Sequence, residues 1–100
     1  MNNELLRKIG LTEGESKVYL GLLKLGSSQA SRIQENIKLE RRSVYDILNK
    51  LIEKGLVVYN DENKVRKFKV VDPSLLINYL EEKKEKIETV KKEIRNELPE

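Results

Sequence analysis

The chain of 100 residues contains no cysteine and no histidine. The absence of cysteine excludes a disulfide framework and a thiolate site, and the absence of histidine removes the commonest metal ligand and general base. Only five glycines are present, and they form neither a P-loop nor a dinucleotide-binding fingerprint. We therefore expect a protein that is not an enzyme and that has no cofactor and no metal site.

Long apolar runs are missing as well. No run approaches the roughly 18 residues that a membrane-spanning helix needs. The first ten residues, MNNELLRKIG, lack the apolar centre of a signal peptide. The sequence predicts a cytoplasmic protein without a membrane partner.

Charged residues are plentiful and unevenly distributed. They make up 37 % of the chain, although the net charge is only +3. Basic residues gather in two places, Arg41-Arg42 and the segment from Lys64 to Lys69. Local clusters decide phosphate binding more than the total charge does, so both places are candidate nucleic-acid contacts. Either cluster taken alone is equally well explained as ordinary solvated surface charge.

Apolar residues make up 38 % of the chain and recur at helical spacing, which predicts one small core. A short helix is expected over residues 2–9. Thr12 and Glu15 have the spacing of a capping box, which starts a second helix that ends at Gly26. Ser27 and Ser28 are expected to cap a third, shorter helix.

A fourth helix is expected over residues 41–54, before Gly55. Val44, Leu48 and Leu51 form its apolar stripe, which leaves the opposite face free to meet a partner. An Arg fork binds guanine O6 and N7 together, and an Asn binds adenine N6 and N7. The candidate DNA contacts on this face are Arg41, Arg42, Ser43, Asp46 and Asn49.

Asp46 lies one helical turn after Arg42 and has two interpretations. Its carboxylate either accepts from a cytosine amino group or holds the Arg42 guanidinium in place, and the second role fits better beside phosphates. The plainer alternative for the whole face is a solvated helix surface that carries an i,i+4 ion pair. The segment that follows the helix favours DNA binding.

That segment reads as a basic hairpin. β-Branched runs over residues 56–59 and 65–71 are separated by the polar cluster of residues 60–63, which we expect to form the turn. The second run and its approach carry four cations without an intervening acid, Lys64, Arg66, Lys67 and Lys69. We expect them to contact DNA phosphates from the strands, because Asp61 and Glu62 at the turn repel phosphate. The alternative is that lysines on an exposed edge strand prevent aggregation.

Asp72-Pro73 marks a helix start, with Asp at the cap and Pro at the first helical position, and the last helix is expected to run from about Ser74 to Leu98. Its heptad a and d positions hold five apolar residues, Leu76, Leu80, Ile87, Val90 and Ile94, and two charged ones, Lys83 and Glu97. This stripe is longer than a core of about 60 residues can cover, so a second copy of the chain is the simplest partner. The alternative is that the helix folds back over Leu5, Leu6 and Ile9.

The orientation of such a pair follows from the flanking charges. In a parallel pair, Lys86 would face Lys91 of the second copy, which is repulsive. An antiparallel crossing would bring Lys86 near Glu93 instead. The antiparallel arrangement is weakly preferred, and both remain open.

Several segments together resemble the DNA-binding domain of the TrmB family of archaeal and bacterial transcriptional regulators. They are GLTEGESKVYLGLLKLG, ASRI, RRSVYDILNKLIEKGLV and KFKVVDP. The resemblance covers about residues 9–80. It implies a winged helix that binds duplex operators as a dimer, often joined through the helix after the wing, and it places Tyr45 at the DNA face with Arg41 and its neighbours.

This chain departs from the family pattern in two ways. Glu40 stands where the family often has proline, which leaves the first residue of the recognition helix open. Longer members add a C-terminal sugar-binding domain that this sequence lacks, so the resemblance implies no sugar effector. The sequence fits either a short member of the family or a fragment.

We therefore predict a mainly α (α+β) fold, a winged helix-turn-helix with a two-stranded wing. Residues 1–73 form the DNA-binding domain, and residues 74–100 form a coiled-coil-like dimerisation helix. The predicted function is a homodimeric transcriptional regulator that binds specific double-stranded DNA. The alternative is a winged-helix module for protein-protein interaction within a transcription or other assembly. Operator, effector and sign of regulation do not follow from the sequence.

Overall fold

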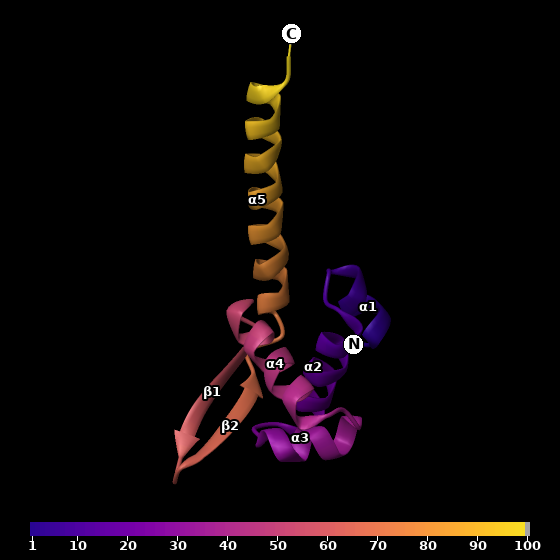
Figure 1. Ribbon diagram of the computed structural model, residues 1–100, viewed down its shortest axis with the longest axis vertical. Coiled ribbons are helices and arrows are strands. Elements are labelled where there is room, and N and C mark those ends of the chain that lie inside the picture. Colours follow the sequence, from indigo (N-terminus) through magenta and orange to yellow (C-terminus); the bar gives the residue numbers. More distant parts are fainter. Residues whose placement is uncertain (100) are drawn as a thin grey trace.

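The computed structural model describes residues 1–99, which fold into five helices and one hairpin (Figure 1). In chain order these are α1 (Asn3–Lys8), α2 (Glu13–Leu25), α3 (Ala30–Ile37), α4 (Arg41–Glu53), β1 (Val57–Glu62), β2 (Val65–Val70) and α5 (Leu75–Glu97). Helices α2 to α4 followed by an antiparallel hairpin form a winged helix-turn-helix, so the predicted fold is confirmed.

A single core lies between α1 to α4 and the hairpin, and we call this part of the molecule the body (residues 1–71). Its buried apolar side chains come from every one of these elements. They are Leu6, Leu11, Val18, Tyr19, Leu22, Ala30, Ile33, Val44, Leu48, Leu51, Leu56, Val57 and Phe68. The fourth helix contributes Val44, Leu48 and Leu51 as predicted, and this fixes which of its faces points outward.

The predicted capping box at the start of α2 is confirmed. The Glu15 amide donates to Thr12 Oγ1 over 3.1 Å, and the Thr12 amide donates to Glu15 Oε1 over 2.8 Å. The Glu15 carboxylate also accepts from Lys54 Nζ at 2.7 and 2.9 Å, although Glu15 is almost completely buried. This ion pair joins the start of α2 to the end of α4.

The expected capping role of Ser27 and Ser28 is wrong. Helix α3 begins at Ala30, and its N-cap Gln29 makes no side-chain capping bond. Ser28 instead exchanges two backbone hydrogen bonds with Phe68, at 2.9 and 2.8 Å, which form an isolated antiparallel bridge beside β2. The serine pair looks like a helix cap in the sequence because the strand partner lies 40 residues away, and sheet pairing satisfies the same backbone groups.

The hairpin turn is also shorter than expected. Strand β1 continues through Asp61 to Glu62, and Glu62 pairs with Val65. Only Asn63 and Lys64 form the loop, with φ of 51° and 65°, the positive pair that a type I′ turn requires. The polar residues 60–62 therefore belong to strand β1. Two of them lie opposite cations, since Asn60 pairs with Lys67 and Asp61 pairs with Arg66.

Helix α5 leaves the body as a long rod, and the C-terminal end lies far from the other elements (Figure 1). The molecule measures 60 × 28 × 26 Å as a result. The helix starts at Leu75, one residue after the predicted start at Ser74. The expected cap at Asp72 is wrong, because Ser74 is the N-cap and Asp72 Oδ1 accepts from the Ser74 amide in the turn before the helix. None of its residues is buried, and it does not fold back over α1.

Candidate nucleic-acid interface

The outward face of α4 presents the polar side chains that the sequence singled out. Burial of the apolar stripe leaves Arg41, Arg42, Asp46 and Asn49 exposed and Ser43 half-buried. No ion pair joins Arg42 to Asp46 within residues 1–99, so the arrangement in which Asp46 holds Arg42 is not formed in the free chain. Both arginine forks are therefore free to meet acceptor atoms on a partner.

A row of aromatic rings connects α4 to the wing. The Tyr45 ring meets Phe68 edge-on, with 6.3 Å between centroids, and the Tyr59 ring lies 6.1 Å from Phe68 on the other side. The Arg66 guanidinium stacks 4.0 Å above the Tyr59 ring. Sequence reasoning missed Tyr59, whose role follows only from the register that pairs it with Phe68.

The four cations of the wing differ in their surroundings. Arg66 donates to both carboxylate oxygens of Asp61, at 2.9 and 3.3 Å, and this contact holds the pKa of Asp61 below its usual range. Lys67 lies 3.7 Å from Glu62, whereas Lys69 and Lys64 make no ion pair within the described chain. The expected position of Asp61 and Glu62 at the tip of the turn is therefore wrong, because both lie in β1, where Asp61 pairs with Arg66 and Glu62 lies near Lys67.

Strand alternation separates these cations onto two faces of the hairpin. Arg66 shares the face of Phe68 and Tyr59, next to α4. Lys67 and Lys69 occupy the other face, near Ser27. The start of α4 thus forms a continuous surface with Tyr45, Tyr59 and Arg66. Lys67 and Lys69 lie on the opposite face of the hairpin.

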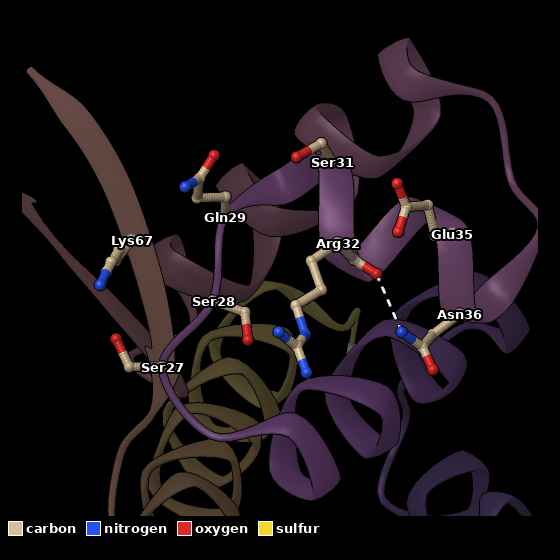
Figure 2. A pocket seen from close by; sticks show the side chains of 8 residues that line it. All are labelled: Ser27, Ser28, Gln29, Ser31, Arg32, Glu35, Asn36 and Lys67. Carbon is tan, nitrogen blue, oxygen red and sulfur yellow. Dashed lines mark hydrogen bonds between the residues drawn. The ribbon is translucent and has the colours of Figure 1, made fainter.

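A polar hollow lies between the second face of the wing and the start of α3. Figure 2 shows Lys67 on the strand at one side of the hollow and Arg32 on the helix. Its lining residues are Ser27, Ser28, Gln29, Ser31, Arg32, Glu35, Asn36 and Lys67. Asn36 Nδ2 donates to the Arg32 carbonyl over 3.0 Å, the bond drawn in the figure. Arg32 is a further cation near the wing, and sequence reasoning did not single it out.

Comparison with known families assigns this arrangement. Residues 6–74, from α1 through the wing, match the family model for the sugar-specific transcriptional regulator TrmB. The chain belongs to the TrmB family. The family and the fold are those of DNA-binding transcriptional regulators rather than enzymes.

Two relatives of this TrmB-family chain are much longer proteins, and the chain spans only a small part of each. It is 44 % identical over 52 residues to the HTH-type sugar sensing transcriptional regulator TrmBL1 of Pyrococcus furiosus, a stretch that covers 52 % of this chain and 15 % of TrmBL1. The structure of TrmBL2, an archaeal chromatin protein, matches with a TM-score of 0.72 and 23 % identity. That match covers 93 % of this chain and 38 % of TrmBL2.

A third relative is close to this chain in length. A possible transcriptional regulator from Methanosarcina mazei Go1 matches with a TM-score of 0.73 and 16 % identity, over 95 % of this chain and 86 % of its own. At such identities the two structural matches show the fold alone. They extend the likeness beyond residue 74 and therefore include much of α5.

Within residues 1–99, no group of three or more acidic side chains is placed to hold a metal ion. No helix in the same range is long and apolar enough to cross a membrane.

Proposed function

We propose that this protein binds specific sequences of double-stranded DNA as a homodimer and regulates transcription in the cytoplasm. The observation that carries the proposal is the surface formed by the start of α4 and the wing. Arg41 and Arg42 are exposed at the N-terminal end of α4, where backbone amides also favour phosphate. A recognition helix meets base edges in the major groove with its N-terminal residues.

The wing extends this surface along the DNA. Arg66, stacked on Tyr59, lies on the same side as Tyr45, and both tyrosines are partly exposed. We propose that Arg66 and Lys64 meet the sugar-phosphate backbone beside the recognition helix, and that Lys67 and Lys69 add contacts from the second face. Phosphate contacts of this kind set register and affinity, while the α4 side chains supply sequence preference.

The homodimer rests on the surface of α5. Leu80, Ile87, Val90 and Ile94 are between 41 and 56 % exposed, and they follow one stripe of the helix. Covering such side chains contributes about 1.5 to 3 kcal/mol for each one. Leu76 already packs against the core of its own chain, so the proposed seam runs mainly from Leu80 to Ile94.

A second copy suits this seam better than an unrelated partner does. The apolar groove at Ile87 and Val90 is bordered by Lys83, Lys86 and Lys91. An antiparallel second copy offers Glu93 to Lys86 in both directions while it covers the same apolar stripe. The pairing also places two α4 helices on one duplex, so we expect roughly palindromic operators with half-sites about one helical turn, or a multiple of it, apart.

The rival function is a protein-interaction module, in which the Arg41-Arg42 face meets a protein. The deciding experiment is a fluorescence titration of the full chain against duplex DNA over a salt series. We expect measurable binding to random duplex and at least about 10³-fold tighter binding to duplexes selected from a random library. The logarithm of affinity should fall linearly with the logarithm of salt concentration. Failure to bind any duplex at low salt would refute the proposal and favour the rival.

A further inference from the structure

Lys83 interrupts the apolar stripe of α5, and its ammonium group makes contacts within its own chain. Its Nζ donates to the Ile9 carbonyl over 3.2 Å and lies 5.3 Å from the centroid of the Tyr79 ring. Ile9 is the C-cap of α1, so its carbonyl has no partner within that helix. A cation at the C-terminal end of a helix is favourable for the same reason. A charged residue at a seam position thus makes a contact within its own chain.

The turn between α1 and α2 is shaped around this ammonium group. Gly10 has φ of +103°, and a Cβ built on it would lie 2.5 Å from Lys83 Nζ. Any other residue there would displace the ammonium as well as strain the backbone. Glycine at this position therefore serves both the turn and the contact with α5.

Lys83 is also the last point at which α5 is held to the body. Before it, Leu76 and Tyr79 pack against the core. Beyond it, every residue from Lys84 to Glu97 is exposed. The free part of the helix is about 20 Å long at 1.5 Å per residue, so a change of about 10° at Lys83 would move its end by about 4 Å.

We propose that Lys83 is a positioning residue that fixes the angle between α5 and the body, and thereby the half-site spacing that the dimer accepts on DNA. This inference rests on the proposed function, because it needs a dimer joined through α5. In such a dimer, the angle at Lys83 sets where the second α4 helix lies relative to the first. With a rigid link, affinity is high only for the half-site spacing at which both α4 helices can bind at once.

The first test compares operators selected by the parent chain and by Lys83→Met. Methionine keeps the unbranched apolar stem, removes the ammonium and adds apolar surface to the seam, so the dimer should be at least as tight. Lys84→Met, one residue away on an exposed position, is the matched control. Lys83→Arg should restore the parent behaviour, because its guanidinium also donates to a carbonyl.

Each chain selects duplexes from the same random-sequence library, and the spacing between half-sites is read from the selected pool. We expect the parent, Lys84→Met and Lys83→Arg to share one narrow spacing. For the parent, moving one half-site by half a helical turn should weaken binding by about 100-fold, and Lys83→Met should lose most of that preference, to about tenfold or less. An unchanged spacing profile for Lys83→Met would overturn the inference while leaving the proposed function intact.

The second test measures the angle without DNA. Because the chain has no cysteine, Lys17→Cys on α2 and Lys92→Cys on α5 give a unique pair of spin-label sites. Labelled chains are diluted with unlabelled chain, so that only distances within one chain are observed. We expect one narrow distance distribution for the parent and a broad one for Lys83→Met; equal widths would overturn the inference. A parent chain that selects no duplex, or that is monomeric, would instead refute the proposed function and this inference with it.

Discussion

The body and α5 hold apolar residues in similar proportions, 29 of 71 residues and 8 of 23, yet they use them in opposite ways, and α5 is the more highly charged of the two. In the body, the apolar side chains of four helices and a hairpin converge on one core, and several are completely buried. In α5, the apolar residues from Leu80 to Ile94 form a stripe that no other element within residues 1–99 buries. Regular apolar spacing therefore predicts that a face will be buried, but the partner that buries it depends on topology.

The difference has a thermodynamic consequence. Contacts within one chain stabilise it at every protein concentration, whereas contacts between two chains contribute only when the copies meet. The body should therefore fold without α5 pairing, and α5 should be stabilised by pairing.

The largest effect is expected from charge placed in the stripe of α5. Ile87→Lys combined with Ile94→Lys should give a monomer, because two cations in each chain would have to be buried in the seam. Affinity for a selected operator should fall by about 10²- to 10⁴-fold, since the two half-sites would no longer be bound by linked domains. Sedimentation equilibrium and fluorescence titration measure the two effects.

The control for this variant adds the same charge to the opposite face of α5, with Thr89→Lys and Asn96→Lys. That pair should leave both dimer and DNA affinity close to the parent. Circular dichroism should show that the body stays folded in both variants. A parent chain that is already monomeric at micromolar concentration would contradict the proposed dimer directly.

The next effect concerns the exposed face of the body. Arg42→Ala should weaken binding to a selected operator by about 1 to 3 kcal/mol and relax the preference at one base pair, because a bidentate base contact is lost. Arg41→Ala should behave in the same way at its own base pair. Neither change should affect the dimer or the unfolding transition. Parent-like affinity in both variants would show that α4 is not the recognition helix.

A smaller effect is expected inside the body, at the ion pair between Glu15 and Lys54. Burial acts to raise the pKa of Glu15, but the hydrogen bonds from Lys54 and from Thr12 outweigh it and hold the pKa below 4.5. The pair therefore stabilises the fold above about pH 4.5, and this contribution is lost as pH falls through the lowered pKa. Lys54→Met should lower the free energy of unfolding at pH 7 by about 2 kcal/mol, because the buried Glu15 carboxylate loses its charged partner. The partial exposure of Lys54 keeps the effect moderate.

The pH dependence distinguishes this ion pair from simple packing. The stability difference between the parent and Lys54→Met should shrink as the solution is acidified, since Glu15 then becomes neutral in both. Urea unfolding at several pH values measures it. A difference that stays constant from pH 7 to pH 3 would show that Lys54 acts only through its aliphatic stem.

The smallest effect is on the salt dependence of DNA binding. Lys69→Gln should reduce the slope of log affinity against log salt by about 0.9, because an unpaired cation that meets phosphate releases one counterion. Lys67→Gln should reduce it less, since Glu62 already lies 3.7 Å from that ammonium. Lys84→Gln on α5 is the matched control and should leave the slope unchanged. An unchanged slope for Lys69→Gln would show that Lys69 does not contact phosphate and serves only to keep the exposed strand from aggregating.

Local patterns predicted the helices well. The capping box at Thr12 and the apolar stripe of α4 are features of neighbouring residues, and both appear in the structure as expected. The candidate contacts on α4 follow from that stripe, so their exposure could be anticipated. Their role on DNA stays a prediction.

Features that depend on distant partners could not be read from the sequence. Ser28 looks like a cap but pairs with Phe68, and Asp61 looks like a turn residue but binds Arg66 across the hairpin. Tyr59 becomes part of the interface only through the strand register. Lys83 looked like a defect in the seam because its acceptor, the Ile9 carbonyl, lies 74 residues earlier. In each case a contact with another part of the chain, between 5 and 74 residues away, gives the group a role that its neighbours in the sequence do not predict.

The pairing of Ser28 with Phe68 also bears on how the molecule opens. These two residues exchange backbone hydrogen bonds in both directions, and the chain between them contains α3, α4 and β1. The bridge thus closes a loop that encloses α4, and the part of the wing at Phe68 cannot detach while the bridge holds. The amides of Ser28 and Phe68 should therefore exchange with deuterium only when the whole body unfolds, as slowly as the most protected amides of α4. The wing would then move on DNA as one rigid piece with α4.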